Sequence, residues 1–320
     1  MVDMGGLECK APRRAHIELS SRCNFKCLTC RHGFVDYGQD IDDEVCDILI
    51  SDVIPYLDEV ELQGTGESLI SHNFDKVFDA VVKNDNCRIC LITNGSLITE
   101  ELAWKFARAN MQLIYSLDGP NEEIFSAQRP VGDFKNIENN IAMIRDIKHR
   151  VPRSLLVTVI NMVLTRYNMF SVMEMVDFAS DMEVECLFVS EVRECMPDKT
   201  VWENLRLDNY GERHELYQQL ALAKKYALEK GIAFYFNPYS DSMVVRKAAC
   251  PSPWQHVFIS AGGDLSFCCE LNSFFGNIKE TSFHDVWNGQ AANNFRSQML
   301  LNCYHKSCLS CCLSWGIMRE

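Results

Sequence analysis

Several features that mark other classes of protein are missing from this chain of 320 residues. No apolar run approaches the roughly 20 residues that a helix needs to cross a bilayer. The first residues also lack the basic-then-apolar pattern of a secretory signal peptide. We therefore expect a cytoplasmic protein with no membrane segment.

Positive charge is scarce as well. The chain has 31 Lys and Arg against 44 Asp and Glu, which gives a net charge of −13. Because phosphate contacts depend on Lys and Arg, this balance argues against a nucleic-acid partner. It is compatible with a cationic substrate, although an acidic surface is more often a means of staying in solution.

Cysteine, by contrast, is abundant, with 16 residues. The cytosol keeps thiols reduced, so clustered cysteines in such a protein indicate metal binding rather than a disulfide framework. The length and the 47% hydrophobic content are sufficient for one large α/β domain and a smaller module.

The most informative stretch has three cysteines, Cys23, Cys27 and Cys30, spaced C-x3-C-x2-C directly after a short apolar run that is typical of a strand. Three thiolates on one loop can each hold one iron of a [4Fe-4S] cube, which leaves the fourth iron open to a small molecule. A structural zinc loop, or a chance spacing, is the simpler alternative.

Strand and helix patterns alternate six times between residues 15 and 190. Most of the strands are too apolar to have one wet face, so we predict a parallel sheet covered by helices. The expected strands lie near residues 16–19, 59–62, 88–92, 113–119, 155–163 and 184–189, with helices near 40–54, 73–83, 98–108, 134–149 and 170–180.

Polar motifs follow the ends of these strands. Gln63-Gly64-Thr65-Gly66-Glu67-Ser68 follows the second strand and Thr93-Asn94-Gly95 the third, and Ser116-Leu117-Asp118-Gly119 forms the end of the fourth. Each says little alone, since Asn-Gly and Asp-Gly are turn sequences. Together they lie at the carboxyl ends of strands, where barrel enzymes carry their chemistry. Glu191 and Arg193 follow the sixth strand and face either substrate or solvent.

In this order, the cysteine loop and the later motifs resemble the radical S-adenosylmethionine (SAM) superfamily. The resemblance implies that SAM chelates the open iron and is cleaved by one electron to methionine and a 5′-deoxyadenosyl radical. It further implies a flavodoxin or ferredoxin as reductant. The implied cofactor-binding residues are Gly64, Gly66 and Glu67 for the methionyl amino group, with Asn94, Ser116 and Asp118 lining the SAM or substrate pocket.

The chain changes character at Cys250. A G-x4-C hairpin follows, then Gly276-Asn277-Ile278, a helix with Trp287 and a last group of cysteines, an order that resembles the SPASM or "twitch" auxiliary-cluster domain. The resemblance implies a second [4Fe-4S] cluster, and zinc is the alternative for the same thiolates. The implied ligands are Cys250, Cys268, Cys308 and Cys311, with Cys312 in place of Cys311, or Cys303, as the open alternatives.

The predicted fold class is therefore α/β, a partial (β/α)6 TIM barrel followed by a small cysteine-rich SPASM/twitch domain. We expect an arm over residues 1–14, the barrel over 15–190, a helical connector over 191–249 with its main helix near 203–230, and the auxiliary domain over 250–320.

The resemblance leaves the reaction open. If the second cluster accepts an electron after a neighbouring hydroxyl is deprotonated, the product is a ketone; if a thiol returns hydrogen to the opposite face, it is an epimer. Cys269 is the candidate donor, because successive side chains of a strand point to opposite sides and Cys269 follows the ligand Cys268. We favour an epimerase acting on a carbohydrate or aminocyclitol.

Three alternatives remain. The enzyme is a dehydrogenase, or it modifies a ribosomal peptide, or the chain is a non-catalytic iron–sulfur protein that transfers electrons. Because only some 14 residues precede the first strand, no leader-binding domain is expected there, and a small-molecule substrate is favoured over a peptide.

Overall fold

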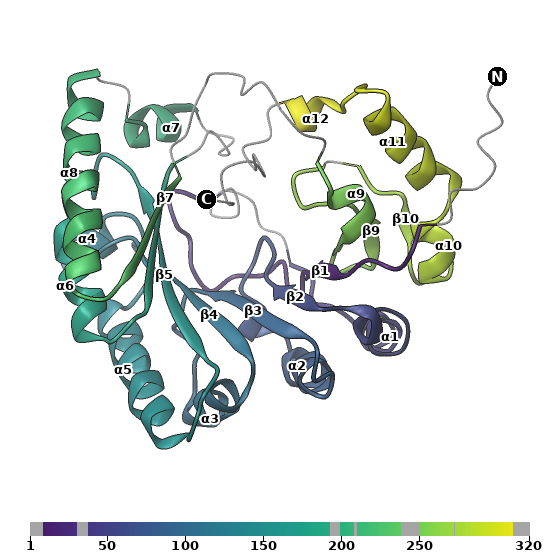
Figure 1. The fold of residues 1–320 in the computed structure, drawn as a ribbon, viewed down its shortest axis with the longest axis horizontal. Coiled ribbons are helices and arrows are strands. Elements are labelled where there is room, and N and C mark those ends of the chain that lie inside the picture. The colour runs from purple at the N-terminus through teal and green to yellow at the C-terminus, as the bar shows by residue number, and fades with distance from the viewer. Residues whose placement is uncertain are drawn as a thin grey trace.

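The computed structural model describes residues 9–30, 38–192, 199–207, 210–237, 250–271 and 273–309. Its central feature is one sheet of ten strands in the order β10-β9-β8-β1-β2-β3-β4-β5-β6-β7. The sheet curves into an open barrel with helices on its outer side (Figure 1). The fold class expected from the sequence, an α/β partial barrel with a C-terminal cysteine-rich module, is confirmed.

Seven consecutive parallel strands form the barrel, one more than the sequence indicates. The seventh strand lies in the stretch assigned to the connector, where buried Ile232 and Phe234 hold it against the neighbouring elements. The strands are β1 (Arg14–Ile17), β2 (Glu59–Leu62), β3 (Arg88–Thr93), β4 (Met111–Ser116), β5 (Val157–Leu164), β6 (Cys186–Glu191) and β7 (Ala233–Asn237).

Helices connect these strands, and polar caps set where several of them begin. Asp42, Thr99 and Asp133 each accept a hydrogen bond from a backbone N–H of the first turn. The helices are α1 (Asp43–Ile48), continued by a π-turn η2 (Leu49–Val53) and a 3-10 turn η3 (Ile54–Tyr56), η4 (Ser68–Ile70), α2 (Phe74–Val82), α3 (Glu100–Arg108), α4 (Glu122–Ser126), α5 (Phe134–Arg150), α6 (Val172–Asp181), α7 (Lys199–Leu205) and α8 (Tyr210–Glu229). The helix expected near 203–230 is thus divided between α7 and α8.

The two faces of the barrel sheet differ in polarity. Register partners on parallel strands point to the same side, so the side chains form rows. One row, Ala15, Val60, Ile89 and Met111, is at most 1% exposed and packs under the helices. The rows between, such as His16, Glu61, Cys90 and Gln112, face the concave side, which we call the lumen.

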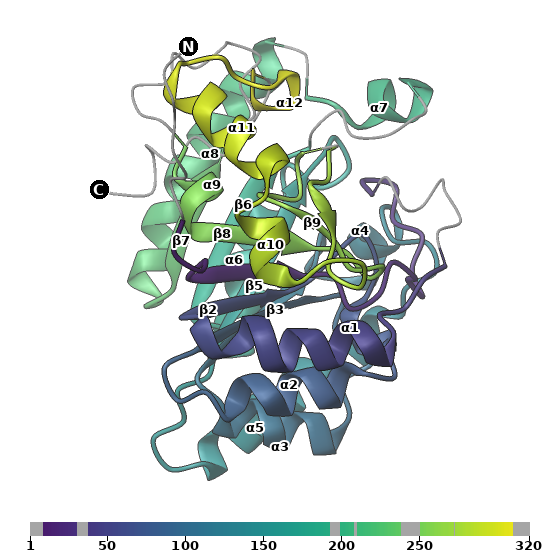
Figure 2. The same ribbon diagram turned by 90° about the vertical axis from the view of Figure 1, so that its right-hand side faces the viewer.

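The C-terminal module continues the same sheet. Strand β8 (His256–Ile259) pairs in parallel with β1, from Arg14 opposite His256 to Ile17 opposite Ile259. Figure 2 shows α9, α10 and α11 on one side of this edge and α1, α2 and α3 on the other. The remaining elements are α9 (Ser252–Gln255), β9 (Asp264–Ser266), β10 (Gly276–Asn277), α10 (Phe283–Trp287), α11 (Gln290–Leu300) and α12 (Lys306–Leu309).

Aromatic packing holds the module together. The Phe267 ring lies 4.4 Å from Phe275 and 5.4 Å from Trp287, and the Arg296 guanidinium lies 4.4 Å from the Trp287 ring. Aromatic pairs and cation–π contacts of this kind stabilise small cores beyond their buried area. In the described parts of the chain, no helix has the length and hydrophobicity to cross a membrane.

Candidate iron–sulfur and cofactor site

The three-cysteine loop begins where β1 ends. Phe25 lies between the cysteines, is 5% exposed and packs edge-on against Phe125, which fixes the loop to the barrel. The backbone N–H of Phe25 points at the Cys23 sulfur at 3.4 Å. Burial raises the pKa of the Cys27 thiol to about 11, and the nearby Arg129 charge opposes that rise. Because iron binds the thiolate form of cysteine, a metal cluster would have to displace the thiol protons of this loop.

A second contact fixes the same loop to the end of β3. The Asn94 amide nitrogen donates to Asn24 Oδ1 at 2.8 Å, and Asn24 Nδ2 donates to Ser96 Oγ at 2.9 Å. Asn94, expected to line the SAM or substrate pocket, therefore also positions the residue directly after Cys23. No sequence pattern identifies Asn24, because a lone asparagine in a loop is ordinary.

The loop that follows β2 lies directly on the cysteine loop. The Glu67 backbone N–H donates to the Arg22 carbonyl at 2.8 Å. A Cβ atom on Gly66 would lie 2.2 Å from that carbonyl oxygen and 2.6 Å from the Ser20 carbonyl oxygen. Only glycine allows this approach, so Gly66 joins the two segments expected to bind cluster and SAM.

Glu67 is 3% exposed and turned toward the end of β3. Its carboxylate accepts from Thr93 Oγ1 at 2.8 Å, from the Asn94 N–H at 2.8 Å and from the Leu69 N–H at 3.2 Å. Burial raises its pKa, although these hydrogen bonds act in the opposite direction. A carboxylate has about four acceptor positions, so there is room for one further donor such as an ammonium group.

Ser116 and Asn161 lie side by side on the lumen face. They are register partners on β4 and β5, and Phe188 on β6 continues the row. The side-chain oxygen of Asn161 is buried without a hydrogen-bond partner among the described residues. Buried acceptors are normally satisfied, so this oxygen is suited to a donor on a bound molecule.

Asp118, expected in the pocket, is fully buried in an ion pair instead. Its Oδ2 accepts from Arg129 Nε at 2.8 Å, and its Oδ1 accepts from the Val163 N–H at 2.9 Å. Burial by itself would lower the pKa of the Arg129 guanidinium. Asp118 and the thiols of Cys27 and Cys30 have the larger, opposite effect, so the net shift of that pKa is upward. Asp118 therefore holds a buried positive charge beside the cysteine loop.

Sequence reasoning missed Arg129. Its only signal is a single basic residue in the short stretch Ala127-Gln128-Arg129-Pro130, which carries no pattern of its own. The neighbouring Leu28 N–H donates to the Gln128 carbonyl at 2.9 Å, so the cysteine loop and this stretch are joined. A cluster held by three thiolates is anionic, and a fixed guanidinium next to it favours the added electron.

We expect Arg129→Gln to lower the midpoint potential of the first cluster by on the order of tens of millivolts, because a positive charge near the thiolates is lost. Arg129→Lys keeps the charge and should shift the potential less. Since Arg129→Gln leaves Asp118 unpaired, the double variant Asp118→Asn/Arg129→Gln separates charge from stability. A redox titration followed by electron paramagnetic resonance (EPR) measures this, and an unchanged potential in Arg129→Gln with full iron would contradict it.

The second group of cysteines lies at the other end of β8. Cys250 precedes α9, which leads into the amino end of β8, and the antiparallel strand β9 brings Cys268 back to the same end. There the His256 Nδ1 atom lies 2.9 Å from the Phe267 carbonyl oxygen. Cys250, Cys268 and Cys308 are half-buried against the main core, and Cys303 is exposed. Cys311 and Cys312 lie outside the described residues.

One premise about this group is wrong. Cys269 was expected to point away from Cys268 through strand alternation, but β9 ends at Ser266, and both cysteines lie in the bend and turn that follow. The Leu271 N–H donates to the Cys268 carbonyl at 3.2 Å and closes that turn. The strand ends early because only Phe258 and Ile259 of β8 pair with β9.

The two cysteine groups lie at opposite ends of the β1–β8 pair. The first loop follows the carboxyl end of β1, whereas Cys268 is near the amino end of β8. The four residues of β1 span roughly 13 Å at about 3.3 Å a residue. Within the described residues, no three His, Cys, Asp or Glu side chains converge on the position of a single metal ion. A [4Fe-4S] cube does not require such convergence on one point, because each thiolate binds a different iron.

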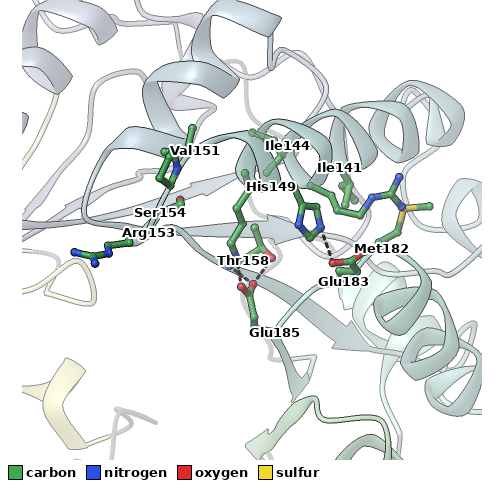
Figure 3. A pocket seen from close by; sticks show the side chains of 13 residues that line it. Ile141, Ile144, His149, Val151, Arg153, Ser154, Thr158, Met182, Glu183 and Glu185 are labelled. Carbon is green, nitrogen blue, oxygen red and sulfur yellow. Dashed lines mark hydrogen bonds and ion pairs between the residues drawn. The ribbon is translucent and has the colours of Figure 1, made fainter.

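Two other features lie outside this site. A cavity of about 550 Å³ opens at the amino ends of β5 and β6, where His149 pairs with Glu183 and Glu185 accepts from Thr158 and Lys148 (Figure 3). It is at the end of the barrel away from the cysteine loop.

Glu191 points under α8, where Arg213 Nη2 donates to it at 2.7 Å, and not into the lumen. Arg193 lies outside the described residues.

A partial parallel barrel, with a three-cysteine loop at its carboxyl end and a second cysteine module, places the chain in the α/β barrel class. A family model described as the Radical SAM superfamily matches residues 17–179, half of the chain, and the chain belongs to this superfamily. A model described as an iron-sulfur cluster-binding domain, SPASM, matches residues 250–312.

Individual relatives are distant. A Pyrococcus furiosus protein, "Tungsten-containing aldehyde ferredoxin oxidoreductase cofactor-modifying protein", is 22% identical over 93% of this chain and 86% of its own length. The fold is similar to that of Streptococcus suis SuiB bound to S-adenosylmethionine, with a TM-score of 0.69 and 16% identity over 90% of this chain and 68% of SuiB. It is also similar to anSMEcpe with bound AdoMet and Cp18Cys peptide, with a TM-score of 0.69 and 18% identity over 94% and 86%.

Membership in these families implies SAM and two [4Fe-4S] clusters as cofactors, and the residues present fit them. Three soft thiol ligands on one loop leave one iron of a cube without a protein ligand. Arg129 supplies a matching positive charge. Gly66 allows the loop of residues 64–67, which we expect to bind SAM and call the SAM loop, to touch the cysteine loop. In the second module, Cys250, Cys268 and Cys308 supply three of the four expected thiols.

Proposed function

We propose that this enzyme removes a hydrogen atom from a carbon of a polar substrate bound in the lumen and produces an epimer, with Cys269 as hydrogen donor. When bound, SAM at the first cluster supplies the 5′-deoxyadenosyl radical that removes the hydrogen. The observation that supports a polar substrate is the unpartnered oxygen of Asn161 beside Ser116. Such an acceptor favours a substrate with hydroxyl or ammonium groups, such as a sugar or aminocyclitol.

The role of Cys269 depends on the turn that carries it. That turn is joined to β8 through His256, whose ring lies 6.5 Å from the ring of the lumen residue His16. Cys269 is half-buried, which is compatible with a thiol that reaches a bound substrate. Its S–H bond would break as a new C–H bond forms on the substrate. The sulfur radical then regains one electron from a reductant of the flavodoxin or ferredoxin class and one proton from solvent.

A dehydrogenase is the second candidate, and Glu61 supports it. Glu61 lies in the same lumen row as His16 and Cys90. Its carboxylate accepts from Gln63 Nε2 at 3.0 Å and lies 3.8 Å from His16 Nδ1. Burial raises the pKa of its carboxyl, and the nearby Glu59 adds to the rise. A carboxylate with a raised pKa is suited to accept the hydroxyl proton that such an oxidation must remove.

A peptide is the second candidate class of substrate. Three of the similar solved structures hold peptides, one of SuiB with the precursor peptide SuiA and two of anSMEcpe, with Cp18Cys and with Kp18Cys. Likeness at 16% to 18% identity extends to the fold alone, so it supports testing peptides without assigning one. The alternative of a non-catalytic electron carrier would make the Gly64–Glu67 loop dispensable.

We expect Cys269→Ala to form 5′-deoxyadenosine while losing the epimer. Anaerobic protein in D₂O would be given SAM, dithionite and a panel of aminocyclitols, sugars and short peptides, with products analysed by mass spectrometry. Native protein should incorporate one deuterium from the exchanged thiol. Cys87→Ala, which removes a thiol just before the amino end of β3, should behave as the native protein. An oxidised product, two mass units lighter, from both proteins would favour the dehydrogenase instead.

A further inference from the structure

Three segments with separate tasks meet at one side chain, Glu18. It directly follows β1 and lies five residues before Cys23, the first cysteine of the loop. It is 7% exposed, and its backbone N–H donates to the Ile259 carbonyl at 3.0 Å, which extends the pairing of β1 with β8. Neither the cysteine motif nor the SAM-binding motif includes this residue.

One carboxylate oxygen of Glu18 holds the loop after β2. Its Oε1 accepts from both the backbone N–H and the hydroxyl of Thr65, each at 2.8 Å. Gly64 leaves the space for this contact, because a Cβ there would lie 2.3 Å from Glu18 Cγ. Thr65 lies between the two glycines of the SAM loop. Its hydroxyl therefore links that loop directly to the Glu18 carboxylate.

The other oxygen reaches the auxiliary module. Glu18 Oε2 accepts from the Ala261 N–H at 3.4 Å, at the turn between β8 and β9. That turn is closed by the Ser260 N–H bond to the Asp264 carbonyl at 3.0 Å, and β9 leads from it to Cys268. The Glu18 carboxylate therefore connects the SAM loop to the hairpin of the second cysteine group, and the backbone of Glu18 leads into the first cysteine loop.

We propose that Glu18 is a positioning residue that couples the SAM loop to the auxiliary module. Hydrogen bonds to a buried carboxylate are stronger than neutral ones, and a partner left without them is costly. SAM binding to the SAM loop therefore stabilises the β8–β9 hairpin through Glu18. In turn, the position of the hairpin affects the affinity of the loop for SAM. This inference rests on the proposed SAM-dependent function and adds a route between its two cofactor sites.

The test compares SAM affinity in the anaerobic, iron-reconstituted full chain. Glu18→Gln keeps the shape but replaces one acceptor by a donor, and we expect SAM binding about tenfold weaker with full iron content. Thr65→Val, which removes only the hydroxyl, should weaken it several-fold, and Thr65→Ser should restore it. The double variant Glu18→Gln/Thr65→Val should be no weaker than Glu18→Gln, because the two changes remove one shared interaction.

Hydrogen exchange measures the coupling itself. SAM should slow amide exchange in residues 62–69 and in residues 258–264 of the native protein, and only in the first segment of Glu18→Gln. SAM should also change the EPR spectrum of the reduced first cluster. At a fixed SAM concentration, we expect that change to be smallest in Glu18→Gln and intermediate in Thr65→Val, the same order as their SAM affinities. A purely structural role would lower the melting temperature and leave SAM affinity and the exchange pattern unchanged.

Two further outcomes separate this inference from the proposed function. Native protein that binds SAM and forms 5′-deoxyadenosine, with both variants within twofold of its affinity, would overturn the inference alone. Native protein that binds no SAM would overturn both. If Glu18→Gln loses iron, Thr65→Val still decides, because it leaves every cysteine and carboxylate in place.

Discussion

Cys27→Ala is expected to abolish 5′-deoxyadenosine formation. Cys27 is the middle thiol of the first loop, and the loop is fixed on both sides by Phe25 and by the bond from the Leu28 N–H to the Gln128 carbonyl. With two thiolates left, the cube loses a ligand that neighbouring side chains cannot replace at the same position. Anaerobic reaction with SAM and dithionite, followed by chromatography, measures the product.

The control for this variant is again Cys87→Ala, which removes a buried thiol before β3 and should leave the product at the native amount. Cys27→Ala should retain only the iron of the second module, about four atoms per chain on the count of one cube. Cleavage of SAM at the native rate by Cys27→Ala would contradict the assignment of this loop.

Gly66→Ala should reduce 5′-deoxyadenosine formation by about a hundredfold or more. The added methyl group would lie 2.2 Å from the Arg22 carbonyl oxygen, so the SAM loop and the cysteine loop must separate. A displacement of about 1 Å at a reacting site can cost roughly a hundredfold in rate. Overpacking against a rigid backbone should also reduce stability by about 1–3 kcal/mol.

Gly38→Ala is the matched control, because a Cβ there meets no atom within 4 Å and the residue has no left-handed backbone conformation. It should retain the native rate and melting temperature. Gly66→Ala with a native rate would show that the two loops need not touch for SAM cleavage. Such a result would contradict the role assigned to Gly66.

The barrel could be predicted from sequence because its information is local. Strand β2 (Glu59–Leu62) agrees with the expected bounds, and α2 and α5 differ from theirs by about one residue. Each is marked by a short apolar pattern and by a cap or turn next to it. The three-cysteine loop is likewise contained within eight residues, so its spacing alone predicts a cluster site.

The pairing of β1 with β8 could not be predicted in the same way. It joins Arg14 to His256, and nothing in either segment specifies its partner strand. The same holds for Arg129 and Asn24, whose importance comes from what the fold brings near them. Glu18 is the clearest case, since its three hydrogen-bond donors come from Thr65 and Ala261.

The candidate site differs from expectation in the tasks of its residues. Glu67, Asn94 and Asp118 were assigned to cofactor or pocket, and each is engaged by neighbouring protein groups. Those contacts fix the loops around the site, and a bound cofactor would add to them. Short sequence motifs indicate where a site lies. Burial and hydrogen bonding in the folded protein decide which of their atoms remain available to a ligand.

The most direct test of the central claim is an iron and sulfide count on the anaerobically reconstituted native protein, combined with an assay for 5′-deoxyadenosine. A two-cluster radical SAM enzyme should hold about eight irons and eight sulfides per chain and form 5′-deoxyadenosine with SAM and dithionite. In Cys268→Ala the count should fall to about four, while the first cluster persists. About four irons with one zinc in the native protein, and an unchanged metal content in Cys268→Ala, would contradict the account.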